Sequence, residues 1–235
     1  MQPGDTDNPL YRRFLEGHPG WPPIHKWHHY FEVYHTAFAP FRGRPVTMIE
    51  IGVQRGGSLR MWQEYLGPQA RIFGMDIDPA CAGRAPEGTK VFIGDQADRD
   101  FLRQVLAETG PPDIVLDDGG HTKRQMINTS HVLDPAMRMP GVYLIEDTHT
   151  AVWGGHFADE PKGQTIYDLA FAVCRELQAW TGRPGAMQRL GIPPGQRPPA
   201  PPVSEVARTT GSVRFHDSMI VFHKAARDEP YHEVR

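Results

Sequence analysis

Four carboxylates stand at the ends of two apolar stretches of this sequence, and a histidine follows one of them. The two stretches are 113–121 and 141–147. Carboxylates this close together repel one another and have raised pKa values unless a cation lies between them. The pattern therefore predicts a divalent metal site with a histidine beside it as a base. The residues concerned are Asp117, Asp118, Glu146 and Asp147, with His121 as the base.

Both stretches are expected to be strands. Runs of apolar residues such as Ile114–Leu116 and Val142–Ile145 are typical of central strands in a parallel sheet that is covered on both faces. If the two strands are neighbours, their ends bring the carboxylates to one edge of the sheet. An alternative is that the acids are helix caps and a solvated rim, with Asp118 capping a helix that begins near Lys123.

A glycine-rich turn between two further predicted strands indicates a cofactor site. The first strand covers 46–52, the turn covers 52–58, and a helix begins at Leu59. Glycines let the backbone approach a ligand closely, and a helix N-terminus offers free N–H groups. The second strand, 70–76, ends in Asp76, and an acid at this position accepts ribose hydroxyls in nucleotide-binding units.

The pattern at the turn is Glu50-x-Gly52-x-x-x-Gly56, whereas the dinucleotide motif has a glycine in place of the acid. A carboxylate at that position repels a pyrophosphate. S-adenosylmethionine carries a sulfonium and an ammonium but no phosphate, and its ribose can bind Asp76. We therefore expect S-adenosylmethionine as the cofactor, which favours a methyltransferase over an oxidoreductase.

In these motifs the chain resembles class I S-adenosylmethionine-dependent methyltransferases. More narrowly, it resembles the metal-dependent sugar O-methyltransferases of the mycinamicin type, which tailor macrolides and other glycosylated antibiotics. The resemblance extends roughly over residues 24–156. The segments that carry it are Ile49–Ser58, Gly74–Pro79, Gly94–Gln96, Asp117–His121 and Leu144–Asp147.

The resemblance implies a reaction and a role for each motif residue. It implies that Asp118, Glu146 and Asp147 hold Mg²⁺ and that His121 is the general base. The metal would lower the pKa of a hydroxyl so that the histidine can remove its proton. The expected reaction, of the EC 2.1.1 class, methylates a sugar hydroxyl of a glycosylated natural product or nucleotide sugar. The expected cofactor-binding residues are Glu50, Gly52, Gly56, Ser58, Asp76, Asp95, Gln96 and Asp117.

Two other functions stay open on the sequence. A catechol-type O-methyltransferase also chelates a diol on Mg²⁺, and Trp153 with Phe157 could form the apolar slot for its flat ring. A non-catalytic S-adenosylmethionine-binding subunit of a biosynthetic complex would bind the cofactor without metal and without methyl transfer.

The fold class predicted from the whole pattern is α/β. We expect a Rossmann-like, mostly parallel seven-stranded sheet with an antiparallel C-terminal edge hairpin. The closing strands are expected around Val206–Thr209 and from Val213–Phe215 to Ile220–His223.

The domain organisation follows from composition. Residues 1–40 are expected to form an N-terminal arm and an aromatic helix, Lys26–Phe38, whose rings pack on the domain. Residues 41–235 are expected to form the methyltransferase domain. Within it, the proline-rich segment 182–203 is expected to hold no regular structure and to form a mobile flap or excursion.

Composition limits the classes of binding partner that we expect. The formal net charge of -3, with mixed signs, gives no basic field, so no nucleic-acid partner is expected. No apolar run reaches the ~18 residues of a membrane span, and Cys81 and Cys174 look like free thiols, so we expect a cytoplasmic protein without a membrane partner. The expected partners are a small-molecule glycosylated acceptor and, because 24–38 is rich in aromatic residues, further copies in a homo-oligomer.

Overall fold

A seven-stranded sheet forms the centre of the protein, in the order β3-β2-β1-β4-β5-β7-β6. The structure, a computed structural model, describes residues 6–159 and 163–235, so the first five residues of the expected arm lie outside the described residues. The strands are β1 (Thr47–Ile51), β2 (Arg71–Asp76), β3 (Lys90–Ile93), β4 (Ile114–Asp117), β5 (Gly141–Ile145), β6 (Thr210–His216) and β7 (Met219–Lys224).

The strand directions confirm the predicted sheet. Strands β1 to β5 are joined by parallel pairs, whereas β7 pairs antiparallel with both β5 and β6. The strand order reverses between β1 and β4, which are neighbours in the sheet. In open sheets of this kind, ligands bind outside the carboxyl ends of the strands at such a reversal.

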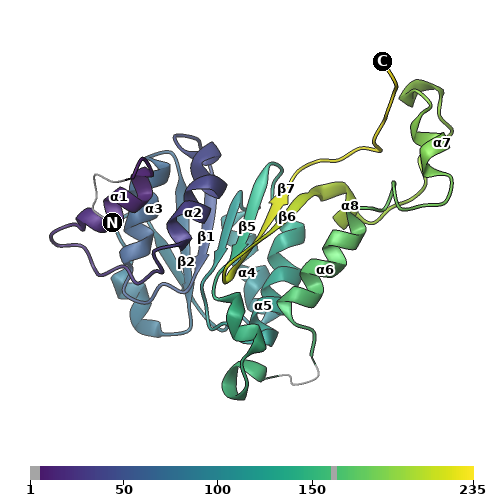
Figure 1. Cartoon of the computed structure of the whole chain (residues 1–235). Coiled ribbons are helices and arrows are strands. Elements are labelled where there is room, and N and C mark those ends of the chain that lie inside the picture. The colour runs from purple at the N-terminus through teal and green to yellow at the C-terminus, as the bar shows by residue number, and fades with distance from the viewer. Residues whose placement is uncertain (1–5, 160–162) are drawn as a thin grey trace.

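Helices cover both faces of the sheet (Figure 1). On one face, α1, α2 and α3 enclose a core that includes Phe31, Phe38 and Trp62. On the other face, α4, α5 and α6 enclose a second core with Leu102 and Met126. Burial of each such side chain contributes about 1.5–3 kcal/mol. The helices are α1 (Pro9–Glu16), α2 (Tyr30–Phe38), α3 (Gly57–Leu66), α4 (Arg99–Thr109), α5 (Lys123–Leu133), α6 (Ile166–Glu176), α7 (Ala186–Leu190) and α8 (Glu205–Thr209).

The N-terminal region differs from its prediction. It contains helix α1, which is capped by Asn8 and buries Leu10 in the core. The aromatic helix α2 begins at Tyr30 and not at Lys26. Residues 22–27 before it are therefore not helical, and Lys26 bonds Glu146, far away in the sequence.

Two predictions near the C-terminus were wrong. Residues 206–209 belong to helix α8 instead of a strand, because the side chain of Ser204 accepts a hydrogen bond from Ala207 N (3.1 Å) and caps the helix. The proline-rich segment also holds regular structure, since α7 lies within it.

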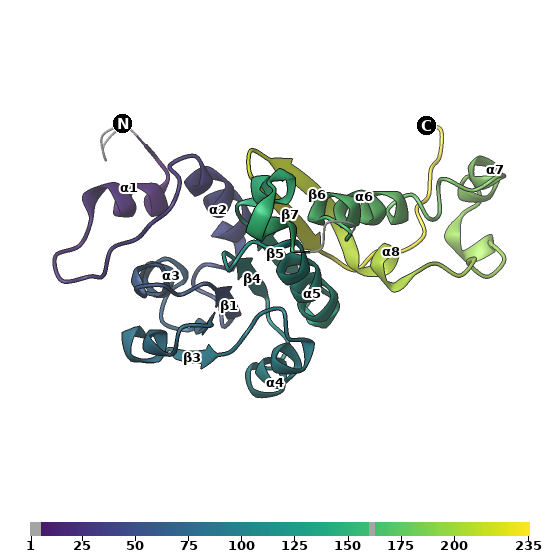
Figure 2. The same ribbon diagram turned by 90° about the horizontal axis from the view of Figure 1, so that it is seen from below.

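The proline-rich excursion is fastened to the C-terminal segment. Figures 1 and 2 both show α7 and the C-terminus side by side, away from the sheet. Glu229 accepts from Arg189 Nη2 (2.9 Å), and His232 N donates to the Leu190 carbonyl (3.1 Å).

Among the residues that the structure describes, no helix is long and apolar enough to cross a membrane.

Candidate active site

A cavity of about 640 Å³ opens at the carboxyl ends of the parallel strands. Its walls come from the turn after β1, the end of β2, the loops after β4 and β5, and the segment before α2. This is the place where a doubly wound sheet offers a ligand site. The predicted site residues that line it are Gly52, Ser58, Asp76, Gln96, Asp118, His121, Glu146 and Asp147.

Asp76 marks the cofactor end of this cavity. One carboxylate oxygen accepts from Val53 N (2.8 Å) and Gln54 N (3.0 Å), and the other accepts from Asp78 N (2.9 Å). Burial by itself raises the pKa of Asp76, but the backbone N–H groups outweigh it and hold the pKa below its usual range. The side chain is therefore a stable anion that can accept ribose hydroxyls.

Gly52 joins the cofactor end to the opposite end of the cavity. Its φ is +90°, and an added Cβ would lie 1.9 Å from the carbonyl oxygen of Asp118. Gly56, the N-cap of α3, is similarly enclosed, since its Cβ would lie 2.4 Å from the Arg84 carbonyl oxygen. Only glycine fits either position, and the turn after β1 touches the loop after β4.

Glu50 does not line the cavity. Its buried carboxylate accepts from Ser58 Oγ and Trp62 Nε1, each at 3.0 Å. Burial raises the pKa of Glu50 to about 7, against the lowering effect of Lys26. The structure thus places Glu50 beneath the turn, where it fixes Ser58.

Asp117 and Asp95 also lie outside the cavity wall. Asp117 is buried and accepts from Gln96 Nε2 (2.9 Å) and Tyr143 OH (3.1 Å). Burial is the main reason why its pKa is raised. Gln96 in turn accepts from Gly120 N (2.9 Å), so this pair supports the loop that carries the histidine. Asp95 accepts from the backbone of its own turn, at the N–H of residue 97 (2.8 Å).

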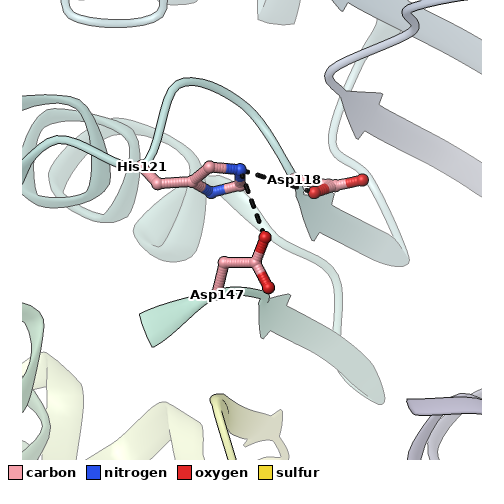
Figure 3. Close-up of side chains that lie close together, drawn as sticks. All are labelled: Asp118, His121 and Asp147. Carbon is pink, nitrogen blue, oxygen red and sulfur yellow. Dashed lines mark ion pairs between the residues drawn. The ribbon is translucent and has the colours of Figure 1, made fainter. Parts of the chain in front are cut away.

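At the other end of the cavity, one edge of the His121 ring faces two carboxylates (Figure 3). Its Nε2 is 3.6 Å from Oδ1 of Asp118 and 3.6 Å from Oδ2 of Asp147. One ligand atom from each of these residues lies within 4.8 Å of the others. Two carboxylate oxygens at this spacing are ligands that suit one divalent cation, and the imidazole lies beside them.

The backbone at this cluster is strained. His121 and Asp147 have φ values of 56° and 49°, in the left-handed region that residues other than glycine rarely adopt. Each such residue costs about 1–3 kcal/mol, and strain of this kind gathers at functional sites.

Asp118 is not the cap of the helix that follows it. Helix α5 is capped by Thr122, whose side chain accepts from Gln125 N (3.3 Å), while Gln125 Oε1 accepts from Thr122 N (3.1 Å). The alternative in which Asp118 serves as a helix cap is therefore wrong, and its carboxylate faces the cavity.

A buried lysine completes this end of the cavity. The side chain of Lys26 is 3% exposed, and its Nζ donates to Asp118 Oδ2 and to Glu146 Oε1 (2.9 Å) and lies 3.9 Å from Glu50. Burial alone lowers the pKa of the ammonium, but the three carboxylates raise it well above its usual range. Burial and the neighbouring Asp118 raise the pKa of Glu146, against the lowering effect of Lys26.

Two phenols also reach the carboxylates. Tyr30 OH donates to Asp147 Oδ1 and Tyr34 OH donates to Glu146 Oε1, each at 2.5 Å. The sequence predicted that these aromatic rings pack on the domain, and it missed their hydroxyl groups. The sequence held a signal for these contacts, namely tyrosine in place of phenylalanine in the aromatic stripe. A buried tyrosine hydroxyl needs a hydrogen-bond partner, whereas a stripe that only packs can use phenylalanine.

Aromatic rings form the rim of the cavity. The loop after β5 lines it through His149, Trp153 and Phe157. Ring centroids are 4.8 Å apart for His149 and Trp153 and 5.3 Å apart for Trp153 and Phe157. On the opposite segment Trp27 is 57% exposed, so apolar surface surrounds the polar centre.

Known proteins similar to this chain include several O-methyltransferases. No protein-family model matches the chain. It is 36% identical over 179 residues to 8-demethyl-8-(2-methoxy-alpha-L-rhamnosyl)-tetracenomycin-C 3'-O-methyltransferase of Streptomyces olivaceus, covering 71% of this chain and 45% of the relative. It is also 36% identical over 152 residues to mycinamicin VI 2''-O-methyltransferase of Micromonospora griseorubida, covering 61% of this chain and 37% of the relative.

A solved structure is similar over almost the whole chain. It is the MycE methyltransferase from the mycinamycin biosynthetic pathway in complex with Mg, SAH and mycinamycin VI. The TM-score is 0.72 at 26% sequence identity, covering 96% of this chain and 55% of that chain. The chain thus spans about half the length of the relatives that it matches.

Proposed function

Starting from the premise that this chain is a homologue of antibiotic sugar O-methyltransferases and has their class I methyltransferase fold, we propose that it methylates a sugar hydroxyl of a glycosylated natural product. The methyl donor is S-adenosylmethionine. The observation that carries the proposal is that one cavity contains both Asp76 and the cluster of Asp118, His121 and Asp147.

We place the proposed metal-binding site at the carboxylate end of the cavity. Asp118 and Asp147, with Glu146 beside them, would hold Mg²⁺, an ion that takes oxygen ligands. When bound there, the ion lowers the pKa of an acceptor hydroxyl to a range in which a histidine can remove the proton.

His121 acts in this proposal as the general base. Its Nε2 accepts the proton of the sugar hydroxyl as the oxygen attacks the methyl carbon of the donor; the C–S bond breaks, its electron pair goes to sulfur, and S-adenosylhomocysteine leaves. The Nε2 atom of His121 lies 3.6 Å from a carboxylate oxygen of Asp118 and of Asp147, so the base stands beside the proposed metal site. At the other end Asp76 binds the ribose, and the bare backbone at Gly52 lets the cofactor approach.

The rim supports a glycoside as the acceptor. Trp27 and Trp153 are half-exposed and line the cavity, so they offer apolar surface to the non-sugar part of such a molecule. The finer expectations, a homo-oligomer, a cytoplasmic location and the lack of a nucleic-acid partner, stay predictions.

The proposal is tested by methyl transfer from labelled S-adenosylmethionine to a rhamnosylated polyketide. A chelator such as EDTA should abolish the transfer, and Mg²⁺ should restore it. The matched control acceptor is the same polyketide without its sugar, which should stay unlabelled. Transfer that persists without metal would contradict the proposal.

Two other outcomes identify the alternatives. Labelling of a catechol but not of the glycoside would favour the catechol-type enzyme, for which the Trp153–Phe157 pair would form the slot. Binding of S-adenosylhomocysteine without transfer to any acceptor, with or without metal, would favour the non-catalytic subunit.

A further inference from the structure

The three proposed metal-binding carboxylates are all contacted by one segment of the chain, residues 26–34. Its first residue, Lys26, donates from Nζ to Oδ2 of Asp118 and to Oε1 of Glu146, the latter at 2.9 Å. The ammonium is almost fully buried and therefore cannot exchange these partners for water.

The same segment supplies two phenols. Tyr34 OH donates to Oε1 of Glu146, and Tyr30 OH donates to Oδ1 of Asp147, each at 2.5 Å. Both tyrosines are buried, and their rings are held by edge contacts, with centroids 6.1 Å apart from each other and 5.3 Å between Tyr34 and Trp62. The position of each hydroxyl is therefore set by ring packing.

Asp118 and Asp147 use their two carboxylate oxygens in the same way, one toward the 26–34 segment and the other toward His121. On Asp118, Oδ2 is bonded to the segment and Oδ1 faces His121. On Asp147, Oδ1 is bonded to the segment and Oδ2 faces His121. A hydrogen bond to one oxygen fixes the rotation of the whole carboxylate, so it also sets the direction of the other oxygen.

We propose that Tyr30 and Tyr34, together with Lys26, are positioning residues that orient the three carboxylates for a divalent cation. The inference rests on the proposed function and adds residues to which nothing in the motifs assigns a role. Each carboxylate offers the cation one oxygen while its second oxygen is held by the 26–34 segment. Loss of such outer partners typically weakens metal binding 10- to 100-fold.

The two tyrosines allow a clean test, because Tyr30→Phe and Tyr34→Phe remove one hydroxyl each and leave the packed ring. Tyr65→Phe is the matched control. Tyr65 is buried in the same aromatic group, and its hydroxyl bonds to Nδ1 of His35 (2.7 Å) instead of a carboxylate.

The measurement is titration of the full chain with Mn²⁺, followed by the electron paramagnetic resonance signal of the free ion, without cofactor or acceptor. We expect each of Tyr30→Phe and Tyr34→Phe to raise the Kd for Mn²⁺ about tenfold or more. The control should match the wild type. Calorimetric affinity for S-adenosylhomocysteine should be unchanged in all variants, a result that a general loss of structure would not give.

The outcomes separate the inference from its premise. If the wild type does not bind Mn²⁺, the metal part of the proposed function fails and this inference fails with it. If the wild type binds Mn²⁺ and the two tyrosine variants bind it equally well, only the inference is overturned. If circular dichroism shows that one variant does not fold, the other variant still tests the inference, because the two hydroxyls contact different carboxylates.

Discussion

The two ends of the cavity are built from different kinds of contact. At the cofactor end the partners are close in the sequence: Glu50 bonds Ser58, 8 residues away, and Asp76 bonds Val53, 23 residues away. At the carboxylate end Lys26 bonds Glu146, 120 residues away. A local motif can therefore build the first end, whereas the second end exists only in the folded chain.

The two ends also stabilise negative charge differently. Backbone N–H groups surround Asp76, and no side-chain substitution removes them. The carboxylates at the other end depend on side chains, namely an ammonium and two phenols. Single substitutions should consequently do more damage at the carboxylate end than at the cofactor end.

The largest expected effect is that of His121→Ala. Removal of a general base lowers turnover by about 10²–10⁴-fold. The affinity for S-adenosylhomocysteine should stay unchanged, because the cofactor end is intact. Initial rates at saturating substrate and calorimetry measure the two quantities. His131→Ala, on α5 and outside the cavity wall, is the control, and a rate for His121→Ala equal to that control would refute the base assignment.

The next effect is on stability and comes from Lys26→Met. The substitution leaves the buried Glu146 and the partly buried Asp118 without their ammonium partner, and breaking one partner of a buried pair costs about 3–5 kcal/mol. Urea unfolding measures the loss, and added Mn²⁺ should recover part of it. The control is Lys90→Met, which breaks an exposed pair with Glu108 and should change little. Equal losses in the two variants would show that the ammonium is not needed.

The smallest expected effect is that of Asp76→Asn at the cofactor end. The amide oxygen can still accept from Val53 N and Gln54 N, but the amide nitrogen cannot accept from Asp78 N, and hydrogen bonds from ribose to a charged acceptor are lost. Such bonds are worth about 1.5–3 kcal/mol, so affinity for S-adenosylmethionine should fall about 10- to 100-fold by calorimetry. Mn²⁺ binding should not change. Asp78→Asn, which keeps the cavity wall intact, is the control. Unchanged cofactor affinity in Asp76→Asn would contradict the ribose assignment.

The sheet could be predicted from the sequence because buried parallel strands are continuous apolar runs. Ile114–Leu116 and Val142–Ile145 are such runs, and both are fully buried in neighbouring strands. The parallel direction then brings Asp118 and Glu146 to one edge. Residues 206–209 were assigned to a strand because of their alternating pattern, but the cap at Ser204 begins a helix there.

The partners of the carboxylates could not be predicted in the same way. Tyr30 and Tyr34 lie in a periodic aromatic stripe, and periodicity reports only which face of a helix is buried. Their hydroxyls meet Asp147 and Glu146 across 117 and 112 residues of chain, so the contacts follow from how α2 packs on the sheet.

The enclosed position of Gly52 has a mechanical consequence. The carbonyl of Asp118 fills the space that a side chain at position 52 would need, so the two loops cannot slide past each other separately. Movement of the turn at the cofactor end is therefore limited by main-chain contact with the loop that carries His121.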